Sequence, residues 1–295
     1  MNEHGSSVVK TIVCKMTERA ARRPWLWGLL GLLLAATCQE ASADPARADS
    51  LRQQSFREMA GERYEYSLDF LMFRNLAEGQ LQMTSTETPE GFRAELVART
   101  LGVASWLSGE RTQRYVSVME ADGAGGLRPV SHESSVLKRK SGVWQERQKR
   151  YRFDYAAGKV YQERGRDGTF TPGLVLELPA EETPVDILTA FYNLRAGVYG
   201  PLTPGVTLQI PTLTSRGISE IGVEALSDKS RPLRPSFPDG GTLLRVWVDP
   251  EIFETGGAAL YVWFDAAGRP ARGVVENVIG LGDVHGHLRE EPKQP

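Results

Sequence analysis

Polar and apolar residues alternate at every second position over long stretches of this chain, beginning near residue 61. In residues 63–70, tyrosine, leucine and phenylalanine occupy the even positions, and charged or hydroxyl-bearing residues occupy the odd ones. Successive side chains of a β-strand point to opposite faces, so this period predicts strands with one buried face. Similar runs cover residues 80–86, 92–98, 111–119, 130–138, 142–154, 207–211, 218–226, 242–249, 260–265 and 272–279. Turns rich in glycine and proline separate them, which predicts a mostly β fold: a curved antiparallel sheet closing toward a barrel or sandwich.

One segment has the period of a helix instead. Pro184 suits the first turn of a helix, Asp186 is favourable near its N-terminal end, and Gly197 can end it. The apolar residues between them share one face at spacings of three and four: Ile187, Ala190, Phe191 and Leu194. We therefore expect one short amphipathic helix over residues 186–195, packed against the sheet and covering one of its sides.

Residues 1–43 have the pattern of a cleavable signal peptide. Three arginines within residues 19–23 form a positive region, and an uncharged apolar run follows over residues 25–36. As a helix this run spans roughly 18 Å, against about 30 Å for the hydrocarbon core of a bilayer, so it is too short for a stable anchor. Small residues then favour cleavage between Ala43 and Asp44. We predict an exported, periplasmic protein with no transmembrane segment after cleavage.

Two alternatives concern this leader. Cys38 could carry a lipid, as in a lipoprotein, although Thr37 is a poor match to the small residue that such a site requires before the cysteine. Met16 could be the true start, because a conventional leader begins there. The chain has two cysteines, Cys14 and Cys38, and both precede the predicted cleavage site. We therefore expect neither disulfides nor thiol chemistry in the exported protein.

The remaining residues fall into three predicted parts. Residues 44–60 are polar, which predicts a flexible N-terminal segment or a short helix. We expect residues 61–288 to form a single β-rich domain and residues 289–295 to form a disordered tail.

The whole chain has 35 basic and 37 acidic residues and a net charge of −2. It lacks the basic excess that binding to nucleic-acid phosphates requires, so nucleic acid is not an expected partner.

Four stretches resemble the DUF3108 family of bacterial envelope proteins, a domain of unknown function. They are the opening strand and its return (61–66 and 77–81), the pair 153–154 with 158–160, the helical segment 184–195, and the closing strand and its turn (261–265 and 269–272). The helical segment, PVDILTAFYNLR, is the most specific of the four.

The resemblance spans roughly residues 61–288, and it implies a periplasmic, mostly β protein without assigned catalytic residues. One departure is Ala266-Ala267, where similar proteins often carry an extra acidic residue. No role for paired carboxylates is therefore carried over to that turn.

Motifs for catalysis are missing from the sequence. It contains no G-x-S-x-G nucleophile elbow, no P-loop and no glycine-rich dinucleotide fingerprint. His285 and His287 could lie on one face of a strand and bind zinc, but a zinc site needs three or four ligands. The other histidine of the predicted domain, His132, is about 150 residues away. We predict neither a metal site nor a cofactor.

A basic run occupies two adjoining predicted strands. The candidate contacts to anionic groups are Lys138, Arg139, Lys140, Lys149 and Arg150. Alternate cations on one strand face could contact the phosphates of lipid headgroups or of lipopolysaccharide. The alternative is a solvated strand face that nearby acids, Glu133 and Glu146, neutralise.

Aromatic residues are spread along the predicted strands and the helix. The candidate ligand contacts among them are Tyr64, Tyr66, Trp144, Tyr192 and Trp263. Such residues usually belong to a core, but a barrel-like sheet lined with them can also accept an acyl chain or the face of a sugar.

These observations favour a non-enzymatic binding or envelope-assembly factor, with a lipid, a glycan or a protein as its ligand. In this interpretation the curved sheet holds the ligand, and the predicted helix covers one side. Two other classes stay open: a hydrolase of cell-wall or surface polysaccharide, and a structural partner in an envelope complex. A lined cavity would favour a carrier, whereas a closed core would favour a scaffold.

Overall fold

The computed structural model describes residues 45–70, 73–101, 110–140, 142–179, 183–232, 237–253, 259–277 and 282–289. They belong to one compact unit, Asp44–Pro295. The predicted leader, with Met16, Cys38 and the cleavage site between Ala43 and Asp44, lies outside the described residues, as does the tail beyond residue 289.

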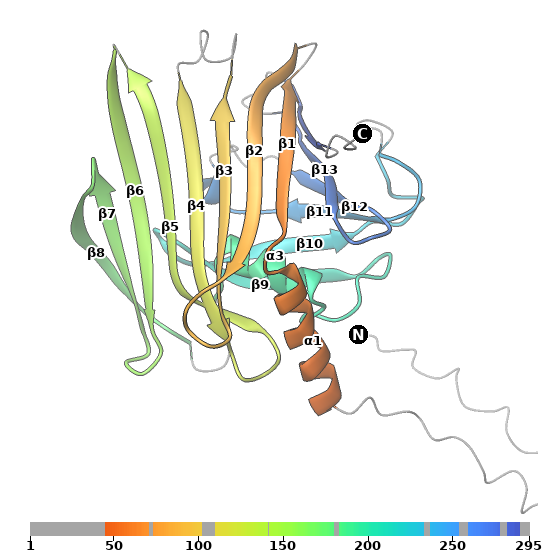
Figure 1. Cartoon of the computed structure of the whole chain (residues 1–295), viewed down its shortest axis with the longest axis horizontal. Helices are drawn as coiled ribbons and strands as arrows, with labels where there is room; N and C mark the ends of the chain where they lie inside the picture. Colours follow the sequence, from red (N-terminus) through yellow and green to blue (C-terminus); the bar gives the residue numbers. More distant parts are fainter. Residues whose placement is uncertain are drawn as a thin grey trace, which may run out of the picture. The chain divides into compact units, whose positions relative to one another are not determined.

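The described residues form three helices and one sheet of 14 strands (Figure 1). The helices are α1 (Pro45–Met59), α3 (Ile187–Arg195) and α4 (Pro250–Phe253). The strands before α3 are β1 (Arg63–Phe70), β2 (Phe73–Ser85), β3 (Gly91–Thr100), β4 (Arg111–Ala121), β5 (Leu127–Lys140), β6 (Val143–Asp154), β7 (Lys159–Arg166) and β8 (Thr169–Glu177). Those after it are β9 (Thr207–Thr214), β10 (Gly217–Ala225), β11 (Thr242–Trp247), β12 (Leu260–Phe264), β13 (Pro270–Val275) and β14 (Val284–Leu288).

Every strand pairs antiparallel with its neighbours, in two runs that meet at the middle of the sheet. The strands β1 to β8 follow one another outward to one edge, and β9 to β14 follow one another from the other edge back to β1. The first and last strands of the chain form the seam, with Tyr66 opposite Leu288. In Figure 1 the strands β9–β11 cross behind β2–β6, so the sheet folds back on itself. The predicted mostly β, antiparallel fold is confirmed, and the sheet remains open at β8 and β9.

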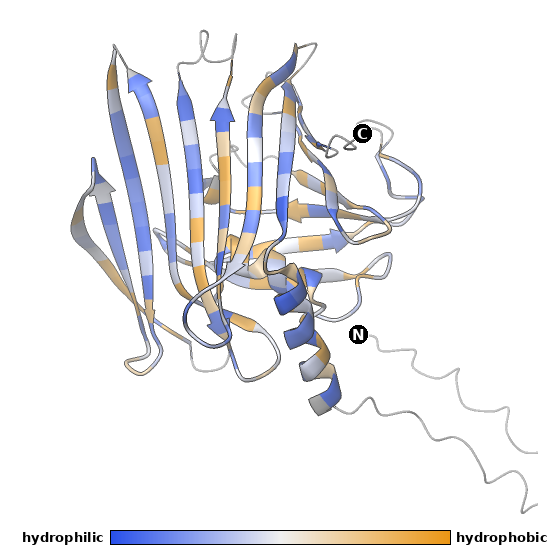
Figure 2. Cartoon of the chain, in the orientation of Figure 1, coloured by the Kyte–Doolittle hydropathy of each residue, from blue (hydrophilic) through white to orange (hydrophobic). Residues whose placement is uncertain are grey.

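Of the two alternatives predicted for the segment after the cleavage site, the structure contains the short helix, α1. Its residues Phe56 and Met59 are buried, and the ring of Phe56 lies 6.1 Å from that of Phe92 on β3. Figure 2 shows α1 as mostly hydrophilic with an apolar strip along one side. The polar composition concealed this strip, whose burial against the sheet holds the helix in place.

The predicted helix is present as α3, and Asp186 caps it. Its position differs from the expected one, because α3 lies between the two halves of the sheet and contacts both. Leu188 and Tyr192 are buried in the hydrophobic cluster of α1 and β1–β5. Ala190 and Leu194 belong to the cluster of β9–β12. The helix therefore forms the centre of the fold and does not cover one outer side.

Candidate ligand-binding site

The apolar face that the sequence assigned to α3 borders an open space. Its four residues, Ile187, Ala190, Phe191 and Leu194, line a cavity of about 180 Å³. The other walls are aliphatic and aromatic side chains, which include Leu81 and Leu96 on β2 and β3 and Val223, Leu244, Val262 and Phe264 on β10–β12. An apolar cavity of about 150 Å³ stays dry and binds a small hydrophobic molecule, so this space is large enough for part of an apolar ligand.

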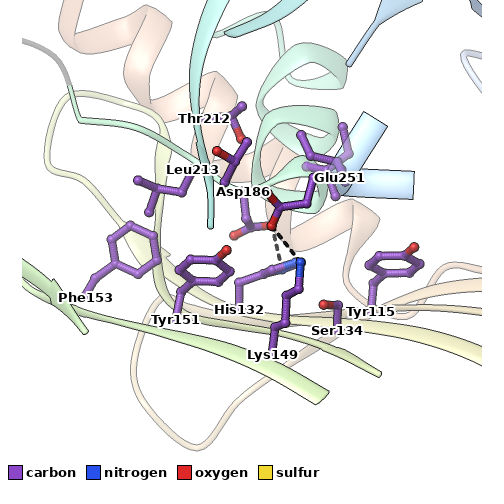
Figure 3. A pocket seen from close by; sticks show the side chains of 13 residues that line it. Tyr115, His132, Ser134, Lys149, Tyr151, Phe153, Asp186, Thr212, Leu213 and Glu251 are labelled. Carbon is purple, nitrogen blue, oxygen red and sulfur yellow. Dashed lines mark hydrogen bonds and ion pairs between the residues drawn. The ribbon is translucent and has the colours of Figure 1, made fainter. Parts of the chain in front are cut away.

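Figure 3 shows a smaller polar pocket, of about 40 Å³, that adjoins this cavity. Ile187 lines both spaces. His132, Lys149 and Tyr151 rise into the polar pocket from β5 and β6. Asp186 and Glu251 point toward them from the start of α3 and from α4. The polar pocket thus lies where the two halves of the sheet face each other.

Asp186 is buried, and its carboxylate accepts four hydrogen bonds. Its Oδ1 accepts hydrogen bonds from the backbone N–H groups of Leu188 and Thr189, at 2.9 and 3.1 Å, and from the hydroxyl of Ser117. Its Oδ2 accepts from the Thr189 hydroxyl at 2.6 Å. Burial by itself would raise the pKa of Asp186, but the adjacent His132 and these hydroxyl donors hold it below its ordinary value. The carboxylate therefore fixes the first turn of α3 to β4 and β5.

Ser117, His132 and Asp186 contact one another without the geometry of a catalytic triad. The Ser117 Oγ lies 2.9 Å from His132 Nδ1, and the Asp186 Oδ1 lies 3.4 Å from the same ring nitrogen. In a triad the nucleophile and the acid contact opposite nitrogens of the imidazole, so that the ring can relay a proton. Ser117 is also completely buried. This cluster fits a structural polar network better than a nucleophile with its base.

Lys149 and Glu251 connect the two halves of the sheet. The Lys149 Nζ lies 2.6 Å from the Glu251 Oε1, and Ser215 donates to the same carboxylate from its backbone and its hydroxyl, at 2.9 and 2.6 Å. Burial opposes the charge of Glu251, but the bonds from Lys149 and Ser215 lower its pKa overall. Glu251 is therefore an anion that already has its partners.

The five candidate aromatic residues occupy three places. Tyr64 and Tyr192 come together around Arg195, whose guanidinium carbon lies 5.7 and 5.9 Å from their ring centres. Tyr66 packs beside them, and its hydroxyl donates to the Pro270 carbonyl at 2.9 Å. Trp144 is exposed on β6, and Trp263 on β12 donates to the Gly240 carbonyl. None of the five lines the apolar cavity.

The candidate cations also lie at different places in the structure. Arg139 pairs with Glu110 at 3.1 Å and Arg150 pairs with Glu133 at 2.9 Å, as expected for a solvated strand face. Lys149 points the other way, into the polar pocket. Lys138 lies on β5 opposite Arg111, and the side chain of Lys140 lies outside the described part of the chain.

His285 and His287 stack on β14 with ring centres 6.4 Å apart, and His287 lies 3.8 Å from the Asp69 carboxylate. Within the described ranges, no three histidine or acidic side chains gather as metal ligands. In the same residues, every helix is too short or too polar to span a bilayer.

The cavity walls are the feature that sequence reasoning missed. Residues such as Leu96, Val223 and Val262 look like ordinary inward-facing strand positions, and only the folded sheet shows that a space separates them. The sequence indicates Asp186 only as a favourable acidic residue near the N-terminal end of the helix. Its contacts to Ser117 and His132 depend on pairings between distant segments, which spacing along the chain does not indicate.

These features define the class of the protein: a β-rich domain in which an open antiparallel sheet folds around one central helix. A family model described as "Protein of unknown function (DUF3108)" matches residues 64–288, and the chain belongs to this family. No curated protein matches the sequence. Among solved structures, the chain is similar to the crystal structure of a beta-barrel-like protein of domain of unknown function DUF1849 from Brucella abortus. The two are 11% identical, the match covers 77% of this chain and 95% of that chain, and the TM-score is 0.46.

Proposed function

We propose that this protein is an exported, non-enzymatic binding protein that holds the apolar part of a ligand in the cavity beside α3. The observation that carries the proposal is the combination of a helix face and strand walls that are almost wholly apolar yet border about 180 Å³ of unfilled space. A core selected only for stability would close such a space, because each buried methylene group contributes about 0.8 kcal/mol. The leader-like first 43 residues support export to the periplasm.

The other two classes have less support. A hydrolase needs a nucleophile or a pair of working carboxylates, and the Ser117–His132–Asp186 cluster has the wrong geometry for the first. A purely structural partner needs no apolar cavity. A ligand carrier accounts for the cavity directly.

A cavity-filling variant tests the proposal. Val262 lines the cavity from β12, so Val262→Trp should occupy the space and lower the affinity for dodecanol at least tenfold. Ile218→Trp is the matched control, because Ile218 is 49% exposed on β10 and is not part of the cavity wall. Binding is measured by calorimetric titration after the protein has been stripped of lipid, and folding by thermal melting.

Dodecanol binding to the wild type and to Ile218→Trp, with loss in a folded Val262→Trp, would support the proposal. Absence of dodecanol binding to the wild type would overturn it, as would equal binding to all three proteins. If Val262→Trp fails to fold, Ala190→Leu provides a smaller filling of the same cavity from α3.

A further inference from the structure

The concave side of the sheet changes from apolar to cationic along rows of directly paired residues. One row, followed from β2 to β7, consists of Leu81, Leu96, Tyr115, Ser134, Lys149 and Arg164. The two leucines line the apolar cavity, whereas Lys149 and Arg164 line a second hollow of about 510 Å³. Neighbouring strands are about 4.8 Å apart, so roughly 14 Å separates Leu96 from Lys149 along this row.

The adjacent row of paired residues shows the same change to cationic residues. It runs from Ala98 through Gln113 and Val136 to Arg147 and Arg166. Arg147 therefore lies directly opposite Arg166, just as Lys149 lies opposite Arg164. Like charges at directly opposed positions of a sheet are destabilising, and an anion bound between them would remove that repulsion.

The second hollow has an excess of positive charge. Its walls contain the cations Arg147, Lys149, Arg164 and Arg166, and one carboxylate, Glu251, which Lys149 and Ser215 already engage. The three arginines are exposed, and among the described residues no carboxylate pairs with them. On the opposite face of β6, by contrast, Arg150 and Arg152 pair with acidic residues.

The polar pocket shares lining residues with both spaces. Ile187 lines both the apolar cavity and the polar pocket. Tyr115, Ser134 and Ile252 line both the polar pocket and the cationic hollow. A single tract of lining residues therefore leads from aliphatic walls to guanidinium groups.

We propose that the ligand is an anionic amphiphile whose chain lies in the apolar cavity and whose charged head is bound by Arg147, Arg164 and Arg166. This inference rests on the proposed function and adds the chemistry of the headgroup. A guanidinium can donate two parallel hydrogen bonds to a carboxylate or to a phosphate, so both heads suit the site. This paired arrangement of N–H donors also explains why arginine, more than lysine, would supply such contacts.

The test compares three probes that share a twelve-carbon chain: dodecanol, laurate and dodecyl phosphate. Each is titrated calorimetrically below its micelle concentration into the wild type, into the double variant Arg147→Gln/Arg166→Gln and into the control Arg152→Gln. Arg152 lies on the same strand but faces away and pairs with Glu163 at 3.2 Å. We expect laurate or dodecyl phosphate to bind the wild type at least tenfold more tightly than dodecanol, and the double variant to lose that difference.

The outcomes separate the two proposals. Equal binding of dodecanol and both anions to the wild type, unchanged in the double variant, would overturn the anionic headgroup and leave the apolar site intact. Failure of all three probes would overturn the proposed function itself. A preference for laurate would identify a carboxylate head and a preference for dodecyl phosphate a phosphate head, and either preference supports the inference. If the double variant does not fold, the single variant Arg166→Gln, at the exposed end of β7, replaces it.

Discussion

The guanidinium of Arg195 donates to both carboxylate oxygens of Glu62, at 2.6 and 3.1 Å, across 133 residues of sequence. The Arg195 side chain is 8% exposed, and that of Glu62 is 25% exposed. The pair joins the last turn of α3 to the start of β1, beside the seam of the sheet. It therefore holds the central helix at the end opposite to Asp186.

Replacing Arg195 with Met should lower the free energy of unfolding by about 3 kcal/mol, because Glu62 would keep its charge in a largely buried place without a partner. Urea denaturation of Arg195→Met, Glu62→Gln and the double variant measures this loss and the coupling between the two groups. If the two single losses simply add in the double variant, the pair contributes no interaction of its own.

Asp186→Ala should destabilise the domain by at least about 2 kcal/mol at neutral pH, since it removes a helix cap and a buried anion that accepts four hydrogen bonds. Asp186→Asn keeps the shape and should lose less. Thermal and urea unfolding measure both effects. A loss below 0.5 kcal/mol for Asp186→Ala, taken as about the size of an ordinary surface change, would contradict this role.

Asp186 should also make the free energy of unfolding depend on pH in the acid range. The pKa of Asp186 in the folded protein is below its ordinary value of 3.8, so its contribution to stability is complete above that pH and declines as the pH falls below it toward the folded-state pKa. The free energy of unfolding of the wild type should therefore decrease with acid more steeply than that of Asp186→Asn. Parallel slopes for the two proteins over the roughly two pH units below pH 4 would exclude the effect.

Asn193 should contribute as much to the stability of the fold as a charged residue does. Its side chain donates to the Leu127 carbonyl and accepts from the Leu127 N–H, each at 2.8 Å, and all of these groups are buried. Asn193→Ala leaves both backbone groups of Leu127 unpaired, at a cost of about 1–3 kcal/mol for each group. Hydrogen exchange at the Leu127 amide should accelerate together with the loss of stability, and an unchanged exchange rate would contradict the prediction.

Alkaline pH should unfold the protein through its tyrosines. Burial raises the pKa of six of the nine: Tyr64, Tyr66, Tyr151, Tyr155, Tyr192 and Tyr261, with that of Tyr151 at about 12. The unfolded chain releases these protons near the ordinary value of 10, whereas the folded chain retains them, so stability falls as the pH rises above 10. Tyrosinate absorbance should increase in one cooperative step together with the loss of circular dichroism. Gradual ionisation of all nine without unfolding would contradict this.

The strands and the central helix could be predicted because each carries a local period. The alternation in residues 63–70 and the spacing of Ile187, Ala190, Phe191 and Leu194 are properties of neighbouring residues, and the structure contains both elements. The helix α1 could be predicted only as one of two alternatives, because only a narrow strip that includes Phe56 and Met59 is apolar. Its burial depends on partners such as Phe92 on a different strand.

The candidate site was harder to predict, because it depends on what the strands enclose. Val262 and Trp263 are neighbours in sequence, yet one lines the cavity and the other faces away from it. The sequence favoured the aromatic residues because of their chemistry, whereas the cavity walls are mainly aliphatic. Of the basic residues, Lys149 belongs to the concave side and Arg150 does not, a distinction that follows from strand register.

The seam between β1 and β14 also decides when this protein can finish folding. The two strands pair from Tyr66–Leu288 to Phe70–Val284, so the first strand waits for the last strand of the domain to be synthesised. Contacts between such distant segments form slowly, and an unpaired strand edge invites association with other chains. A nascent chain that ends before residue 284 therefore exposes β1 along its whole edge. Until the final strand pairs with it, this edge stays available for association with other chains.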